Sequence, residues 1–178
     1  MENLAFMFCP LFQDMNEDIA EYFYKLRNIH NLINKITFIV NVYFTFIRSI
    51  LEKSAVVWHG SLSKKNRLTL ERVQKAAVKI ILKNRYTNYE KGLEILRMES
   101  LDERRRHLCL KFAKNCLKND KLNGMFNKRK DMHRMMKRNR KEYEEKMSQT
   151  KRYKESAIPY LTNLLNAEKE EQKQILMG

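Results

Sequence analysis

The amino-acid sequence predicts an all-α fold, a bundle of about five to six helices. Four glycines and two prolines in 178 residues are too few for the many tight turns of a β-sandwich or β-barrel. Hydrophobic residues make up 43% of the chain, enough to bury a core, so wholesale disorder is not expected. Apolar residues also recur at helical spacing in several long segments. At 21.5 kDa the chain has the size of one ordinary domain or of a piece of a larger protein.

The amino-terminal residues differ in composition from the rest. Acidic residues from Asp14 to Glu21 precede Lys25, the first basic residue. Asp14 or Asn16 can cap a helix with an acidic first turn, which the helix dipole favours. We therefore expect a helix over about 17–34.

A second helix is expected over 36–58, ended by His59-Gly60. Its β-branched and aromatic residues would also suit a strand, but its length favours a helix. The uncharged run over 36–47 is well short of the ~20 residues that cross a bilayer, and no basic region precedes the apolar residues of the amino terminus. An intracellular location is expected.

The third helix is expected over about 62–83, with Ser61 or Ser63 as its N-cap. Apolar residues at helical spacing define the inner face of this segment, namely Leu70, Val73, Ala77, Ile80 and Ile81. At about 100° per residue, five basic residues gather on the opposite side within roughly an 80° arc. They are Lys65, Arg72, Lys75, Lys79 and Lys83.

Two further helices follow. Tyr86 and Tyr89 bracket a Thr-Asn turn, and a short helix with Leu93, Ile95 and Leu96 is expected after it. Ser100 with Glu103 forms a capping box for a helix that runs to Lys118. In that helix Leu101, Leu108, Phe112 and Cys116 share one stripe. Arg104, Lys111, Lys114 and Lys118 share another.

The carboxy-terminal third combines a basic run with a last helix. Residues 128–141 carry eight basic residues and one acid, a net charge of 8 − 1 = +7, and methionine is their only large apolar side chain. This composition indicates a flexible arm or a weakly packed helix. The last helix follows Ser156, with Pro159 in its first turn and Leu161, Leu164 and Leu165 facing inward.

Four segments are therefore expected. They are a divergent acidic amino-terminal helix over 1–35, a helical core over 36–127, a basic arm over 128–155 and a carboxy-terminal helix over 156–178.

No catalytic or metal-binding pattern is evident in the sequence. There is no adjacent Asp pair, no Gly-rich phosphate loop and no HExxH motif. Cys9, Cys109 and Cys116 are widely spaced, without a CxxC pair, and are expected to be small buried side chains. His59 and the other histidines are expected to be surface or capping residues. We expect neither enzyme activity nor a metal or cofactor.

Charge is the strongest functional signal. The 36 basic and 21 acidic residues give a net charge of +15, which favours a polyanionic partner such as RNA, DNA or an RNA–DNA hybrid. The candidate phosphate contacts are Lys65, Arg72, Lys75, Lys79, Lys83, Arg104, Lys111, Lys128, Arg129, Lys130, Lys137, Arg138 and Arg140. A solvated face is the alternative for the stripe on the third helix. The basic arm also suits a nuclear import signal.

Aromatic residues near the basic stripe allow two interpretations. Tyr86 and Tyr89 would suit stacking on bases, but packing at the helix junction is favoured. Trp58 is likewise expected to anchor the core.

Several ordered blocks of sequence resemble one known family. Within 42–82, Ile47-Arg48-Ser49-x-Leu51-Glu52 precedes Val57-Trp58-His59 and then Leu70-Glu71-x-Val73-Gln74-Lys75-x-Ala77. This order resembles the block that follows the polymerase core in jockey-like non-LTR retrotransposon reverse transcriptases. The later stretches YTNYEKGLEIL (86–96), LDERRRHLCLKFA (101–113) and RYKESAIPYLTNLLN (152–166) agree in order.

The resemblance covers about 42–166 and implies a thumb and post-thumb region. In that family these helices grip the primer–template duplex through its backbone. Lys53 departs from the pattern, which commonly has Tyr at this position, and the aspartate-bearing polymerase motif and the endonuclease domain are not found in this sequence. The resemblance thus implies a noncatalytic carboxy-terminal fragment.

Two other functions stay open. The rival interpretation is a protein–protein interaction module or an inert relic. Its helices would bury apolar surface that the polymerase core once covered, and this surface would now promote self-association. An acidic-lipid binder would need a basic amphipathic helix with a large aromatic face. The basic arm has none, so we expect no membrane partner.

Overall fold

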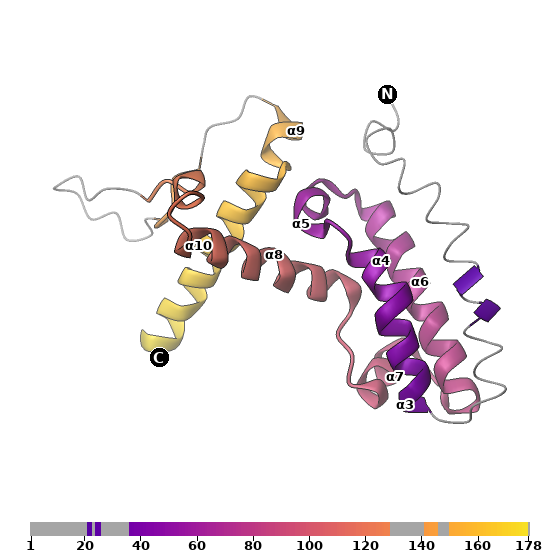
Figure 1. Ribbon diagram of the computed structural model, residues 1–178. Helices are drawn as coiled ribbons and strands as arrows, with labels where there is room; N and C mark the ends of the chain where they lie inside the picture. Colours follow the sequence, from indigo (N-terminus) through magenta and orange to yellow (C-terminus); the bar gives the residue numbers. More distant parts are fainter. Residues whose placement is uncertain (1–20, 23, 26–35, 129–140, 146–149, 178) are drawn as a thin grey trace. The chain divides into compact units, whose positions relative to one another are not determined.

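The computed structural model describes residues 21–22, 24–25, 36–128, 141–145 and 150–177. Within these residues every regular element is a helix, and the one β-type contact is an isolated antiparallel bridge between Lys128 and Tyr143 (Figure 1). The predicted all-α fold is confirmed. Most of the helix expected over 17–34 lies outside the described residues.

The chain divides into two compact units. Residues 1–54 and 62–104 form the first unit, and residues 55–61 and 105–178 form the second. The last boundary falls inside helix α8 (Leu101–Lys118), so this helix contributes residues to both units. These boundaries differ from the four segments expected from the sequence.

The first unit begins with a helix that contains a π-helical turn. α3 (Ile36–Val42), the π turn η1 (Tyr43–Arg48) and α4 (Ser49–Glu52) follow one another without a break. Ile39, Tyr43, Ile47 and Leu51 are its buried residues, each four positions after the last. In a regular α-helix such a row drifts by about 40° per step. A π turn has more residues per turn, so it reverses part of this rotation around the helix axis.

The expectation of one helix over 36–58 is wrong at Lys53 and Ser54. α4 ends at Glu52, Lys53 has a non-helical ψ of 122°, and Ser54 has a left-handed φ of 54°. A left-handed non-glycine residue costs on the order of 1–2 kcal/mol. Leu51 is buried in the first unit and Ala55 in the second. The break lets each of these side chains pack in its own unit.

α6 (Lys64–Leu82) begins and ends close to the expected positions. Ser63 is its N-cap and accepts a hydrogen bond from the Asn66 backbone N–H at 3.2 Å. Three of its buried side chains were predicted, namely Leu70, Ala77 and Ile81. Three others were not predicted, namely Gln74, Val78 and Leu82. Lys83 follows on a left-handed backbone and begins the 3-10 turn η3 (Lys83–Arg85). In Figure 1, α6 lies alongside α3 and α4.

α7 (Tyr89–Leu96) is the short helix expected after Thr87-Asn88, and Asn88 is its N-cap. The Asn88 side chain accepts from the Lys91 N–H at 2.8 Å. Gly92 brings α7 close to α6, since a Cβ atom at this position would lie 2.6 Å from Val78 Cγ1.

A polar network ties the helices of the first unit together. The Tyr43 hydroxyl donates to Gln74 Oε1 at 2.9 Å, and Gln74 Nε2 donates to the Glu99 carbonyl at 2.8 Å. The Glu71 carboxylate accepts from the Tyr89 hydroxyl and from the Leu101 N–H. Gln74 and Glu71 thus connect α6 to the helices before and after it.

The start of α8 carries the expected capping box. The Ser100 hydroxyl accepts from the Glu103 N–H at 3.2 Å and donates to Glu103 Oε2 at 2.9 Å. The expected inner stripe is only partly right, because Phe112 is 40% exposed while Arg105, Cys109 and Ala113 are buried. The buried row is displaced by about one position from the predicted one.

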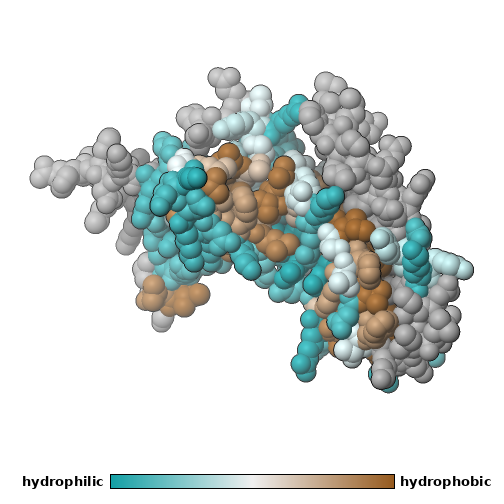
Figure 2. Space-filling model, viewed as in Figure 1, coloured by the Kyte–Doolittle hydropathy of each residue, from teal (hydrophilic) through white to brown (hydrophobic). Residues whose placement is uncertain are grey.

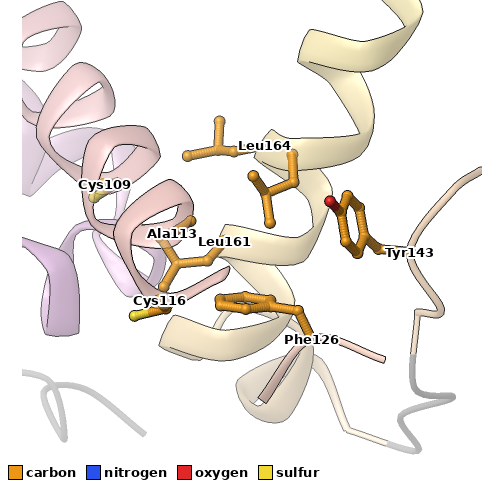
Figure 3. Packing of buried hydrophobic residues seen from close by; sticks show 8 residues of the cluster. Cys109, Ala113, Cys116, Phe126, Tyr143, Leu161 and Leu164 are labelled. Atoms are coloured by element: carbon orange, nitrogen blue, oxygen red, sulfur yellow. The ribbon is translucent and has the colours of Figure 1, made fainter. Parts of the chain in front are cut away.

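The core of the second unit joins α8 to α10 (Ala157–Met177) (Figure 3). Cys109, Ala113 and Cys116 of α8 form one cluster with three leucines of α10. These are Leu161, Leu164 and Leu165, which were predicted to face inward. Phe126 follows the 3-10 turn η4 (Asn123–Met125) and is one of the aromatic residues of this cluster. The buried thiols of Cys109 and Cys116 agree with the sequence prediction, and Cys9 lies outside the described residues.

Tyr143 attaches the described part of the basic arm to this core. Its side chain is 7% exposed, and its backbone N–H and C=O pair with the Asn166 side chain at 2.9 and 3.1 Å. A weakly packed arm was expected here, but 141–145 is anchored to α10. Near the end of the arm is the short helix α9 (Lys151–Lys154).

His59 is buried, whereas a surface or capping residue was expected. It lies in the 3-10 turn η2 (His59–Ser61), after α5 (Ala55–Trp58), and meets the Tyr160 ring edge-on at 5.6 Å. The turn approaches α10 closely, since a Cβ atom at Gly60 would lie 2.7 Å from Tyr160 Cβ. Nearby, the buried Arg105 guanidinium lies 5.7 Å from the centre of the half-buried Trp58 ring.

Candidate nucleic-acid interface

The outer side of α6 carries the candidate interface. Lys65, Arg72, Lys75 and Lys79 are all exposed, and we call these four residues the basic face. They lie opposite the buried row of Leu70, Ala77 and Ile81, so the packing of the helix directs them to solvent. Lys83 is exposed too but lies just beyond the end of the helix.

Within the described ranges, none of the four cations of the basic face takes part in an ion pair with an acidic side chain. Glu71, the acid within the same stretch of α6, is half-buried and bonded to Tyr89 and to the Leu101 N–H. Four uncompensated positive charges on one side of a helix attract an extended polyanion.

Three arginines elsewhere in the first unit are paired with acids. Glu52 Oε1 lies 3.3 Å from Arg104 Nε and 3.6 Å from Arg48 Nε. Arg67 Nη1 lies 2.8 Å from Asp102 Oδ1. Arg104, a predicted phosphate contact, thus already has an acidic partner.

In the second unit, acids of α10 neutralise cations of α8. Lys114 Nζ lies 2.5 Å from Glu168 Oε1, and Arg106 Nη2 lies 3.8 Å from Glu171 Oε1. Lys128, another predicted contact, pairs with Glu142 at 3.3 Å. Lys111 is exposed on α8.

The structure gathers only part of the predicted set. Four predicted residues of α6 share one face, whereas Lys111 and Lys128 belong to the second unit. Five predicted residues lie outside the described part of the chain, namely Arg129, Lys130, Lys137, Arg138 and Arg140.

Aromatic residues beside the basic face have protein partners. The Lys79 Nζ atom lies 5.5 Å from the centre of the Tyr86 ring. Tyr89 is half-buried and donates its hydroxyl proton to Glu71. Burial, and secondly this hydrogen bond, raise the pKa of Tyr89 far above its ordinary value. Tyr89 therefore belongs to the α6–α7 packing, as the favoured sequence interpretation held.

Leu68 is a member of this surface that sequence reasoning missed. It is 61% exposed. At about 100° per residue it falls between Lys75 and Lys79 on the helical wheel. The same wheel that identified the basic stripe would have found it, had apolar residues been sought on the outer side.

The described residues contain no group of three or more His, Cys, Asp or Glu side chains able to hold a metal ion. A shallow pocket in the second unit is lined by Met125, Asn127, Glu144, Tyr153, Ile158, Pro159 and Thr162, with Glu144 its one carboxylate. None of the helices described reaches the length and apolar character of a membrane span.

Fold and site together define an all-α protein in which the basic face of α6 has no ion-pair partner in the part of the chain that the structure describes. The chain matches no family model, no curated protein and no solved structure.

Proposed function

We propose that this chain is a noncatalytic carboxy-terminal region of a non-LTR retrotransposon reverse transcriptase that binds the nucleic-acid backbone without sequence preference. The observation that carries the binding function is the basic face of α6, with its exposed and locally uncompensated cations. The ordered sequence blocks that resemble jockey-like elements carry the family.

One of the segments that carry the resemblance overlaps the basic face. In Leu70-Glu71-x-Val73-Gln74-Lys75-x-Ala77, Leu70, Gln74 and Ala77 are buried and Glu71 is bonded to Leu101. Lys75 and the intervening Arg72 face solvent. This division supports a motif that serves two purposes, packing of α6 on its inner side and phosphate contact on its outer side.

Phosphate neutralisation explains how such a face would bind. Each lysine or arginine that contacts a phosphate releases condensed counterions, so affinity falls as salt rises, by a slope of about 0.9 per contact on duplex DNA. Backbone contacts position a protein but carry no sequence information. An A-form RNA–DNA hybrid, recognised through shape and backbone, is the ligand that the resemblance implies.

Fluorescence anisotropy tests the proposal with the full chain and a short RNA–DNA hybrid, a DNA duplex and a single strand, each at several salt concentrations. Replacing Lys65, Lys75 and Lys79 together by Gln should lower the salt slope by about three units on duplex. The matched control replaces Lys121, Lys151 and Lys154, which are exposed in the second unit. Equal slopes for the two triple variants, or no salt-dependent binding by the wild type, would refute the proposal.

A protein-interaction module or inert relic is the second candidate. Phe38 and Phe46 are 45% and 49% exposed, and Tyr22 stacks on Phe46 with ring centroids 5.6 Å apart. Ile175 and Leu176, near the end of α10, are 80% and 86% exposed. Figure 2 shows hydrophobic patches interrupting the hydrophilic surface. Concentration-dependent mass in light scattering, with no nucleic-acid binding at low salt, would favour this candidate.

A further inference from the structure

We infer that Tyr86 is a positioning residue of the basic face, whose ring orients the Lys79 ammonium toward backbone phosphates instead of stacking on a base. This inference rests on the proposed function and adds a role for a residue outside α6.

The geometry links Tyr86 to Lys79 on one side and to α7 on the other. Lys79 Nζ lies 5.5 Å from the ring centroid, within the ~6 Å at which the negative face of an aromatic ring attracts a cation. A Cβ atom at Gly92 would lie 3.7 Å from Tyr86 Cδ2, so the ring also lies next to α7. The Tyr86 backbone N–H donates to the Lys83 carbonyl at 3.1 Å. Tyr86 is therefore held by its backbone and by α7.

A fixed ring beside a lysine has a direct consequence for phosphate binding. A lysine side chain has many rotamers and loses this freedom when its ammonium is held on a phosphate. A ring that already restricts Lys79 reduces the entropy lost on binding. At an exposed site a cation–π contact corresponds to about a two- to fivefold change in affinity.

The surroundings of Tyr86 and Tyr89 do not favour base stacking. Stacking on a tyrosine needs an accessible aromatic face, and Lys79 lies over the Tyr86 ring. Tyr89 is half-buried in the α6–α7 packing. The surroundings of both tyrosines thus favour binding of the nucleic-acid backbone over stacking of unpaired bases.

Two ligands and four variants test the inference. The ligands are a single-stranded oligonucleotide and an abasic strand with the same number of phosphates, and the variants are Y86F, Y86L, K79Q and K79Q/Y86L. Y86F keeps the ring and should bind like the wild type. Y86L should weaken binding about two- to fivefold on both strands, and should have no further effect when Lys79 is already replaced.

Several outcomes would overturn the inference while leaving the proposed function intact. One is that Y86L loses affinity for the intact strand but not for the abasic strand. The second is that the effects of K79Q and Y86L on affinity add up in the double variant, and the third is that K79Q keeps the salt dependence of the wild type. Failure of the proposed function looks different, because the wild type would then bind neither strand in a salt-dependent manner.

A second set of variants covers the case in which Y86L does not fold. Fluorinated phenylalanines at position 86 keep the shape of the ring and weaken its attraction for a cation. Affinity should fall with each added fluorine while the thermal midpoint, followed by circular dichroism, stays constant. Constant affinity across this series would also refute the inference.

Discussion

The Glu71 carboxylate accepts a hydrogen bond from the Leu101 backbone N–H at 3.2 Å, although the two residues are thirty positions apart. The bond satisfies one of the N–H groups that the first turn of a helix leaves unpaired, and it places a negative charge at the positive end of the helix dipole. The same carboxylate accepts from the Tyr89 hydroxyl. One acidic residue of α6 thus holds both α7 and the start of α8.

Replacing Glu71 by Gln should lower the free energy of unfolding by about 1–2 kcal/mol, because a charged cap and a charge-assisted hydrogen bond are lost together. Urea denaturation measures the change. Glu94→Gln, an exposed position on α7, is the control and should change stability by less than about 0.5 kcal/mol. Equal effects at the two positions would contradict the capping role of Glu71.

Tyr89 should make stability sensitive to alkaline pH. Burial, followed by the hydrogen bond to Glu71, raises its pKa in the folded state, whereas the unfolded chain has the ordinary value of 10.0. Above pH 10 the unfolded state therefore releases a proton that the folded state keeps, and stability falls as the pH rises. Below pH 10 this contribution is fully present.

The comparison with Tyr89→Phe isolates this effect from the titration of lysines. At neutral pH the variant should be less stable by about 1 kcal/mol for the lost hydrogen bond. The difference between the two proteins should shrink as the pH rises above 10, which denaturation curves at several pH values will record. A gap that stays constant to pH 11 would show that Tyr89 does not titrate as described.

Gly60→Ala should destabilise the second unit by about 1–3 kcal/mol, the usual cost of overpacking. An added Cβ would lie 2.7 Å from both Cβ and Cγ of Tyr160 and 3.0 Å from the Glu155 carbonyl oxygen. Gly124→Ala is the matched control in the same unit, because nothing lies within 4 Å of the added atom. Thermal denaturation of both variants gives the comparison, and similar midpoints would contradict the close approach.

Arg104→Gln should leave nucleic-acid binding nearly unchanged, because Glu52 already neutralises Arg104 in the folded protein. Lys75→Gln should by contrast lower the salt slope on duplex by about 0.9. Anisotropy titrations at several salt concentrations compare the two single variants. A larger decrease for Arg104 than for Lys75 would move the candidate interface from α6 to the start of α8.

Caps and helical periodicity were predictable because they depend on neighbouring residues. The Ser63 and Ser100 caps and the inward leucines of α10 were all found as expected. The exposure of the basic face also followed from the helical wheel. The buried stripe of α8 was predicted about one position away from its true place. It includes Arg105, which is buried in the second unit. A charged side chain inside a core is not what hydrophobic patterning predicts.

By itself, the sequence determined the helical class of this protein, the caps of its helices and the side of α6 on which its lysines gather. These features arise from hydrogen bonds and periodicity that extend over only a few residues. Tertiary structure alone decided the break at Ser54, the burial of His59 and the pairing of Arg104 with Glu52. Each of these depends on packing between segments distant in the chain, and such packing can override local preference.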